Sequence, residues 1–341
     1  LLKLGSPLVA TRSFADPEVA VIYDRARAIS RATGEHRAMF GAVRGLWQAA
    51  IGRSDYASGS ELADELVALA AVVDDPGLEL EAHRAVGNAV FWSGQFEKAR
   101  KSMEYAVSVA DVHPDAPLPQ GFSQDPEIAN RGILAWTLAS MGHLRAAAEH
   151  IDAALDRGGA LHHPFSMAYA LGAAMWTYFI IRDETATEDF ANQLVHISDE
   201  HGFPYFHIAG VTGRAWGRAN TGSPVEALDE LRDALADWRS SNGTIGMAMF
   251  LYVQAEIEAL AGRPEQVLKT LLHPILQGRL KVEQWYRADV IRLRSEAQWQ
   301  LGDLETATAS MRSARRLATE QSARMASLRI ACFEARELGG P

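Results

Sequence analysis

The sequence contains a single cysteine, Cys332, among 341 residues. One cysteine excludes an intramolecular disulfide, which is typical of proteins of the reducing cytoplasm, where we expect this chain to work. Cys332 lies in an apolar helical stretch with Ile330 and Phe333, and this setting favours a buried structural thiol over a nucleophile.

The chain is also short of positive charge. Lys and Arg number 33 against 43 Asp and Glu, so the formal net charge is −10. This balance lacks the basic footprint of nucleic-acid binders, and we expect no nucleic-acid partner. Basic residues gather near the C-terminal end, and we interpret them as solvated helix faces rather than a binding stripe: Arg312, Arg315, Arg316, Arg324 and Arg329.

Targeting and membrane signals are scarce. No signal peptide is visible, and the opening Leu1–Gly5 lacks an initiator Met, which is typical of a piece cut from a longer protein. The uncharged run 164–181 just reaches the length of a membrane span. Because it falls in phase with the repeats described below, we interpret it as a core helix and expect no membrane partner.

Catalytic motifs are missing as well. The sequence has no HExxH, CxxC, GxSxG or GxGxxG pattern. Asp74 and Asp75 precede Pro76 and indicate a helix cap rather than an acid/base pair. His162 and His163 indicate a turn rather than a metal site, because adjacent residues on a helix point about 100° apart. We therefore expect no enzyme site, no cofactor and no metal.

What the sequence does have is a repeat. Its unit is a turn residue, an apolar anchor two residues later and a small residue three further on. Five clear copies and two weaker ones occur, at 94–99, 142–147, 222–227, 262–267 and 302–307, and at 54–59 and 183–188. The intervals are 40, 48, 41, 39, 40 and 40 residues, and the long one locates an insertion at His113–Gln124.

Each unit has a physical interpretation. Gly in the left-handed conformation ends one helix, and the small residue lets two helices approach closely. These features match a tetratricopeptide repeat with a pitch near 40 residues instead of about 34. No stretch alternates with a period of two, so we expect no strands and about fourteen to sixteen helices.

The predicted fold is all-α, a right-handed superhelical solenoid of about seven tetratricopeptide-like hairpins forming one domain over 1–341. A helix at about 17–32 precedes the array, and a capping helix at 320–337 closes it. The predicted repeats span 36–73, 77–111, 125–157, 164–201, 204–241, 244–277 and 282–319.

In such a solenoid the first helix of each hairpin lines the concave groove, and residues ten, six and three before the turn marker share one face. The candidate groove and partner-binding residues are Arg44, Gln48, Arg84, Asn88, Trp136, Trp216, Tyr252, Glu256, Arg292 and Glu296. Arg84 and Asn88 resemble part of a clamp for a terminal carboxylate. Two alternatives stay open: the charged residues pair with neighbours and face solvent, and the aromatic residues pack between helices instead of contacting a ligand.

A family resemblance rests on four segments that occur in order: 124–126 (QDP), 163–166 (HPFS), 200–204 (EHGFP) and 285–296 (WYRADVIRLRSE). Together they resemble the C-terminal tetratricopeptide tail of bacterial regulators that join a class III adenylate/guanylate cyclase domain to an AAA-type or signal-transducing ATPase domain. The likeness runs from about residue 7 to 320. It implies a sensor or scaffold tail. The sequence departs from the catalytic parts of that family, because neither cyclase aspartates nor a phosphate-binding loop is recognisable.

Two functions follow as hypotheses. The first is a non-catalytic module that binds a peptide, a partner domain or a small-molecule effector in its groove and regulates an attached signalling domain. The alternative is an oligomerisation scaffold with an empty groove, self-associating through an apolar face such as 167–179.

Overall fold

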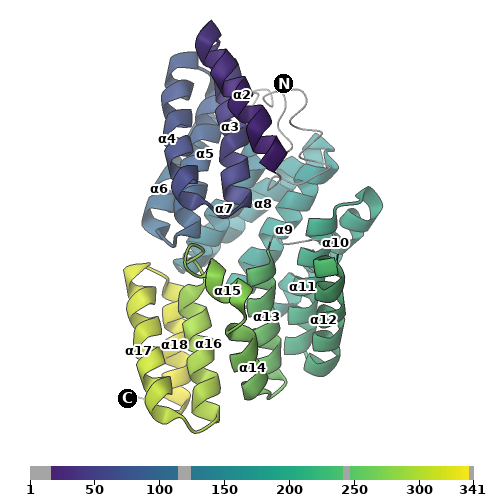
Figure 1. Cartoon of the computed structure of the whole chain (residues 1–341). Helices are drawn as coiled ribbons and strands as arrows, with labels where there is room; N and C mark the ends of the chain where they lie inside the picture. Colours follow the sequence, from purple (N-terminus) through teal and green to yellow (C-terminus); the bar gives the residue numbers. More distant parts are fainter. Residues whose placement is uncertain (1–16, 114–123, 241–245, 338–341) are drawn as a thin grey trace. The chain divides into compact units, whose positions relative to one another are not determined.

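A computed structural model describes residues 17–113, 124–240 and 246–337, with side chains from residue 20 onward (Figure 1). Over these ranges the chain forms seventeen α-helices and no strand, so the all-α prediction is confirmed. The predicted insertion at His113–Gln124 lies almost wholly outside the described residues. The chain divides into two compact units, Leu1–Leu134 and Ala135–Pro341. A single continuous array over 1–341 therefore stays a prediction.

Unit 1 is built from consecutive antiparallel helices that pack on their sequence neighbours. These are α2 (Pro17–Thr33), α3 (His36–Gly52), α4 (Tyr56–Val73), α5 (Pro76–Trp92) and α6 (Phe96–Val112). The boundary between the units falls inside the next helix, α7 (Pro126–Ser140).

Unit 2 continues the pattern in the remaining helices. They are α8 (Leu144–Leu161), α9 (Pro164–Ile181), α10 (Glu184–His201), α11 (Pro204–Asn220), α12 (Pro224–Ser240), α13 (Met247–Leu260), α14 (Pro264–Leu271), α15 (Pro274–Arg279), α16 (Arg287–Gln300), α17 (Leu304–Glu320) and α18 (Arg324–Glu337). Successive pairs match the predicted repeats 36–73 through 282–319, and α18 matches the predicted capping helix.

The long pitch comes from long helices. Most helices have 17 or 18 residues, and a short turn brings each half-repeat to 20 residues. The turns use a positive φ at Gly34, Ser54, Asp74, Gly94, Gly142, His162, Arg182, Gly202, Gly222, Gly262, Gly302 and Ser322. From Gly142 to Gly302 the inner turns recur every 40 residues. The fourth turn marker is therefore Arg182, with φ 67°, and its prediction at Asp183 was one residue off.

The sixth hairpin departs from the regular pattern. Its second helix is replaced by two short ones, α14 and α15, which is why the helix count exceeds the expected fourteen to sixteen. Pro274 explains the break, because its ring lacks an N–H and disfavours a helical residue before it. His273 instead caps α15, its Nδ1 accepting the N–H of Ile275.

Several local predictions are confirmed. Asp75 caps α5 by accepting the backbone N–H of Gly77 and Leu78. His163 caps α9 by accepting the N–H of Ser166. Within the described ranges α9 alone is long and apolar enough to cross a membrane, yet two thirds of it (67%) is buried in the fold. The run 167–179 is mostly buried against neighbouring helices, and self-association through it stays a prediction.

One local prediction was wrong. Cys332 is exposed, whereas Ile330 and Phe333 are buried. Ile330 and Phe333 are three residues apart and share the inner face of α18, and the helical period turns Cys332 away from that face.

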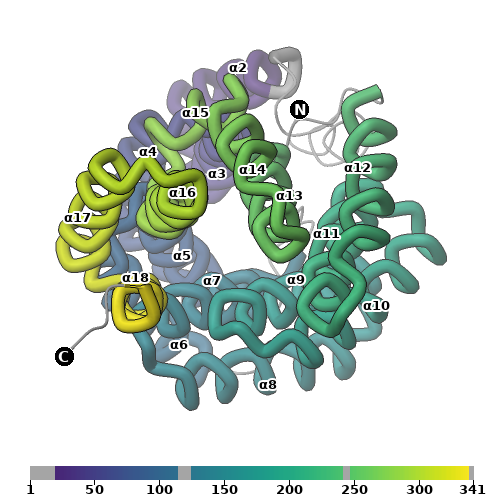
Figure 2. Tube along the Cα trace, turned by 90° about the horizontal axis from the view of Figure 1, so that it is seen from below, coloured from purple at the N-terminus to yellow at the C-terminus, as the bar shows by residue number. Residues whose placement is uncertain are grey.

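Unit 2 curves back so that its last helices meet its first ones. A Cβ placed on Gly142, in the turn between α7 and α8, would lie 3.3 Å from Cβ of Arg324 at the start of α18. Trp136 of α7 stacks on Trp285, just before α16, at 6.5 Å between ring centroids. Figure 2 shows α18 among the last helices of unit 2, beside α16 and α17. The segment before α16 and the start of α18 therefore contact the first residues of unit 2.

Candidate ligand-binding site

In unit 1 the predicted cationic patch is a buried ion cluster. Nε of Arg44, on α3, donates to Glu81 on α5 at 2.6 Å, and Nε and Nη2 of Arg84 donate to the same carboxylate at 2.6 and 2.7 Å. Arg44 also donates to Gln48 at 3.0 Å. Asn88 accepts the indole N–H of Trp92 at 3.0 Å. The cluster therefore joins two neighbouring hairpins.

The charges in this cluster compensate each other away from solvent. Arg84 is 2% exposed and Glu81 fully buried. Burial would raise the pKa of Glu81, but the charges of Arg84 and Arg44 and their hydrogen bonds outweigh it and lower that pKa. Burial lowers the pKa of Arg44 despite Glu81. A ligand carboxylate at Arg84 would have to displace Glu81. The four predicted residues of this cluster therefore fit a structural role better than a carboxylate clamp: Arg44, Gln48, Arg84 and Asn88.

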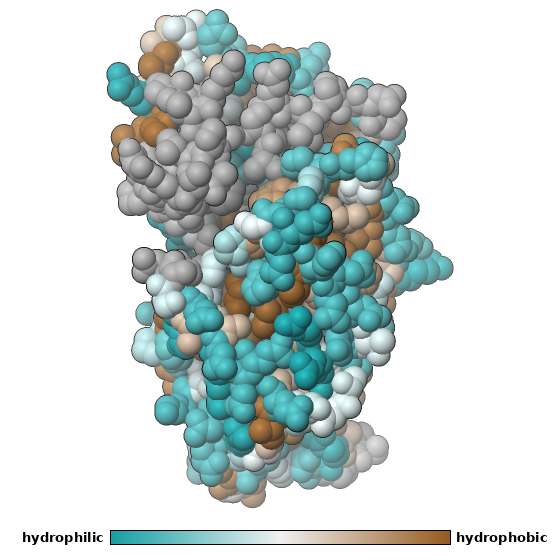
Figure 3. Space-filling model, turned by 90° about the vertical axis from the view of Figure 1, so that its right-hand side faces the viewer, coloured by the Kyte–Doolittle hydropathy of each residue, from teal (hydrophilic) through white to brown (hydrophobic). Residues whose placement is uncertain are grey.

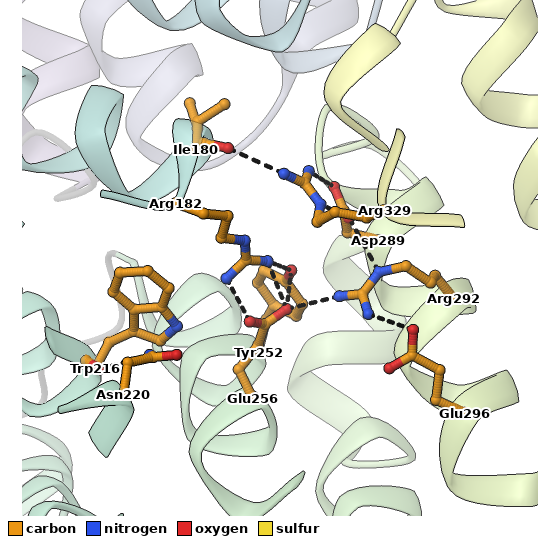
Figure 4. A network of polar contacts seen from close by, with 10 residues as sticks. All are labelled: Ile180, Arg182, Trp216, Asn220, Tyr252, Glu256, Asp289, Arg292, Glu296 and Arg329. Carbon is orange, nitrogen blue, oxygen red and sulfur yellow. Dashed lines mark hydrogen bonds and ion pairs between the residues drawn. The ribbon is translucent and has the colours of Figure 1, made fainter. Parts of the chain in front are cut away.

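In unit 2 the predicted residues from three hairpins converge on one network (Figure 4). Glu256 of α13 accepts hydrogen bonds from Arg182 Nη2 at 2.8 Å, from Arg292 Nη2 at 2.9 Å and from Tyr252 Oη at 2.6 Å. Arg292, on α16, also donates to Glu296 at 2.7 Å. The network thus links residues that are 74 and 36 positions apart in the sequence.

A second carboxylate extends the network to the C-terminal helix. Asp289 accepts Nε and Nη2 of Arg329 at 2.7 and 2.6 Å, and Arg292 Nε at 3.3 Å. Nη1 of Arg329 donates to the carbonyl of Ile180, at the end of α9, at 2.9 Å. Because Ile180 and Arg329 are 149 residues apart, this contact holds the two ends of unit 2 together.

Electrostatics keep the network ionised. Burial would raise the pKa of Glu256, but the charges of Arg182 and Arg292 and the hydrogen bonds of Arg182 and Tyr252 outweigh it and lower that pKa to about 2. Burial is outweighed in the same way at Asp289, where Arg329 lowers the pKa. Burial and the charge of Glu256 raise the pKa of Tyr252, so its hydroxyl stays protonated and donates.

Aromatic rings pack around this network. Trp216, on α11, is 1% exposed and meets Phe179 edge-on at 4.9 Å between centroids. The guanidinium of Arg182 lies 5.0 Å from the Phe179 ring centroid and 5.3 Å from that of Trp216. Tyr252 stacks on Tyr286 at 5.6 Å. Trp136 lies outside this group, and its indole N–H donates to the carbonyl of Ala173 at 2.9 Å.

The packing of α11 on α10 places Trp216. A Cβ on Gly217 would lie 3.0 Å from the carbonyl oxygen of Glu184 and 2.7 Å from Cβ of Glu188, so only glycine lets the two helices come this close. Trp216 is adjacent in sequence and points about 100° away from that contact. Its ring is thereby directed inward, toward Arg182.

A small cavity adjoins the network inside unit 2. Its volume, measured for a water-sized sphere, is about 20 Å³, which is room for a water molecule or two. Polar groups of Arg182, Tyr252, Asp289 and Arg329 border it. Ser140 also lines it, and its other walls are apolar or aromatic and include Phe179, Ile180, Met249, Trp285 and Tyr286. A ligand group larger than a water molecule or two, a carboxylate included, must widen this space.

Sequence reasoning found part of the site. Trp216, Tyr252, Glu256, Arg292 and Glu296 lie together, but Trp216, Tyr252, Glu256 and Arg292 are buried between helices, and a role in partner binding stays a prediction. It missed three members, Arg182, Asp289 and Arg329. Asp289 precedes Arg292 by three residues, a spacing that signals an ion pair on one helix face. The interpretation of the C-terminal basic residues as a solvated face is wrong for Arg329, since its side chain is only 17% exposed.

No metal site accompanies the network. Within the described parts of the chain, no group of three or more His, Cys, Asp or Glu residues lies close enough to hold a metal ion. The chemistry of the site is therefore that of arginine and tyrosine donors facing carboxylate acceptors.

Comparison with known proteins identifies the fold. No protein-family model matches the chain, and no curated protein sequence matches it. Among solved structures it is similar to a Rap protein complexed with competence and sporulation factor, with a TM-score of 0.62 and 16% identity. The match covers 83% of this protein and 76% of the Rap protein. The fold is a tetratricopeptide-like helical solenoid.

Proposed function

We propose that this chain is a non-catalytic interaction module whose second unit binds a peptide or protein partner on its inner side and regulates an attached signalling domain. The observation that carries the proposal is the network around Glu256. Inner residues of α11, α13 and α16 converge there with Arg182, and they adjoin a cavity bordered by two arginines.

The residue types suit recognition of a partner. Arginine, tyrosine and tryptophan are the residues that most often dominate binding energy at protein interfaces. Here Arg292, Tyr252 and Trp216 lie on helices, which hold side chains more rigidly than loops do, and Arg182 lies in the turn after α9. The Rap protein with this fold is itself complexed with competence and sporulation factor, which supports a binding role for the fold.

Regulation requires that binding change the module. The contacts that close unit 2, between Arg329 and Ile180 and between Arg182 and Glu256, join segments far apart in sequence. A ligand that competes for these arginines would loosen the closure and shift the helices that carry them. Such a shift is the kind of change an attached domain can sense.

Capture and titration test this function. The immobilised protein is used to capture partners from a lysate of the source cells, each captured partner is purified, and its affinity is measured by calorimetry. We expect Arg182→Gly and Arg329→Gln each to weaken binding at least about tenfold.

Arg145→Ala is the matched control, because the Arg145 side chain is 93% exposed on the outer surface of α8. It should leave the affinity unchanged. Partners that bind all four proteins equally, with circular dichroism unaltered, would contradict the proposed function.

A further inference from the structure

Arg182 occupies a backbone position that glycine fills in the other repeats of unit 2, whereas Ser54 fills it in the first repeat of unit 1. The turns at Gly142, Gly222, Gly262 and Gly302 have a positive φ, and Arg182 takes the same slot with φ 67°. A side chain there strains the left-handed backbone, and glycine would end the helix without that strain. The guanidinium at this turn makes contacts with Glu256 that a glycine could not make.

Arg182 shares this carboxylate with two other donors. The guanidinium of Arg182 contacts Glu256 through both terminal nitrogens, and Arg292 and Tyr252 donate to the same group. Two guanidiniums and a hydroxyl around one carboxylate are a carboxylate receptor built from side chains. In this structure the receptor is filled by the protein's own glutamate.

The receptor has unused donors. The indole N–H of Trp216 is buried and has no hydrogen-bond partner. Figure 4 shows its nitrogen turned toward Arg182 and Glu256. An arginine has five N–H groups, and the three contacts of Arg182 leave some of them unused. A buried donor without an acceptor is unfavourable, and the Trp216 ring lies beside Arg182, with the guanidinium 5.3 Å from its centroid.

The cavity gives an incoming group a place to sit. Arg182 and Arg329 both border it, and their side chains are 21% and 17% exposed. If Arg182 turns to a new carboxylate, Glu256 keeps Arg292 at 2.9 Å and Tyr252 at 2.6 Å. The exchange therefore leaves no buried charge without a partner.

We propose that Glu256 is an internal stand-in for a ligand carboxylate, and that the partner of unit 2 places an acidic side chain or its own C-terminal carboxylate between Arg182 and Arg329. Trp216 reports this exchange because the Arg182 guanidinium lies 5.3 Å from its ring centroid. This inference rests on the proposed function and specifies its ligand chemistry. Binding exchanges the Arg182–Glu256 pair for an Arg182–ligand pair.

Acetate is the probe, since it has the charge and size of the group in question, and acetamide at equal ionic strength is its neutral match. The readout is the indole ¹H–¹⁵N signal of Trp216, assigned with Trp216→Phe. Acetate should shift this signal and acetamide should leave it in place. Equal shifts with both compounds would overturn the inference.

Two variants separate this role from a structural one. Glu256→Gln removes the internal competitor, so acetate should bind about tenfold more tightly. Arg182→Gly restores the glycine of the other repeats of unit 2 and should abolish the acetate shift while circular dichroism stays unchanged. The inference is overturned if Glu256→Gln binds acetate no more tightly, and also if Arg182→Gly binds it as the wild type does. Should Glu256→Gln fail to fold, Arg182→Gly alone decides.

Short peptides identify the source of the carboxylate. Acetyl-Ala-Ala-Ala with a free C-terminus tests the terminal carboxylate, acetyl-Ala-Glu-Ala-amide tests the acidic side chain, and acetyl-Ala-Gln-Ala-amide is the neutral control. We expect one or both acidic peptides to shift Trp216, and equal binding of the neutral peptide would overturn the inference. If partners bind through Arg182 and Arg329 without a carboxylate, this inference fails and the proposed function stands.

Discussion

The two units contain the same motif with different surroundings. On α5 and on α16 an acidic residue precedes an arginine by three positions, Glu81 before Arg84 and Asp289 before Arg292. In unit 1 the partner arginine, Arg44, comes from the neighbouring hairpin. In unit 2 the further arginine, Arg329, comes from the last helix and also reaches α9.

The ion cluster of unit 1 joins two neighbouring hairpins, whereas the network of unit 2 joins distant ones. The cluster in unit 1 is sealed, since the side chains of Arg44, Glu81 and Arg84 are 6%, 0% and 2% exposed. The network in unit 2 borders a cavity and links distant repeats. Each network has a buried tryptophan N–H without a hydrogen-bond partner, Trp47 in unit 1 and Trp216 in unit 2. The two networks have similar residue types. They differ in their exposure to solvent and in how far apart in the sequence the repeats they join are.

The largest expected effect is in unit 1. Glu81→Ala leaves Arg44 and Arg84 buried without their carboxylate, so we expect the free energy of unfolding of this unit to fall by about 3–5 kcal/mol. Hydrogen-exchange mass spectrometry measures the loss in α3 and α5 separately from unit 2. A loss below about 1 kcal/mol would contradict the description of a buried ion cluster that stabilises unit 1.

The next effect is the pH dependence of unit 2. The pKa of Glu256 is lowered to about 2, so its contribution to stability is complete above its usual value of 4.5 and is lost as the pH falls toward 2. The lost contribution is about 3 kcal/mol. Urea unfolding at about pH 6, 4 and 2.5 should show a smaller loss for Glu256→Gln than for the wild type, and parallel curves would argue against an ionised Glu256.

Opening the closure should have a moderate effect. Arg329→Gln removes the ion pair with Asp289 and the bond to the carbonyl of Ile180, and we expect a loss of about 1–2 kcal/mol because the group is partly exposed. Faster exchange should appear in α18 and at the end of α9. Arg316→Gln, whose side chain is 74% exposed, is the matched control and should change neither.

The smallest effect concerns the turn at Arg182. Arg182→Ala loses the ion pair and keeps the left-handed backbone, whereas Arg182→Gly loses the pair and relieves the backbone. We therefore expect Arg182→Gly to be more stable than Arg182→Ala by about 1 kcal/mol in thermal unfolding. If Arg182→Ala is instead the more stable of the two variants, the left-handed backbone at this turn does not favour glycine.

Much of the fold could be predicted because local chemistry sets the repeat. Pro76, Pro126, Pro164 and Pro204 begin helices, and Gly94, Gly142, Gly222, Gly262 and Gly302 end them, so the spacing of these residues determined the hairpins. The break at Pro274 was equally local but was missed, because the repeat pattern suggested one helix over that stretch. The boundary between the two units lies inside α7, and no turn residue in the sequence indicates it.

The candidate site could be predicted only where its residues follow the inner helical face. Trp216, Tyr252, Glu256, Arg292 and Glu296 do so, and they converge. Arg182 lies in a turn and Arg329 on the capping helix, so their roles depend on which distant helices meet. That choice arises from the closure of unit 2, which no periodicity in the sequence encodes.

The most direct measurement is the affinity of a purified captured partner for Arg182→Gly, set against Arg145→Ala in the same buffer. Binding on the inner side of unit 2 predicts a loss of at least about tenfold for Arg182→Gly and none for Arg145→Ala. Equal affinities in two folded variants would contradict it.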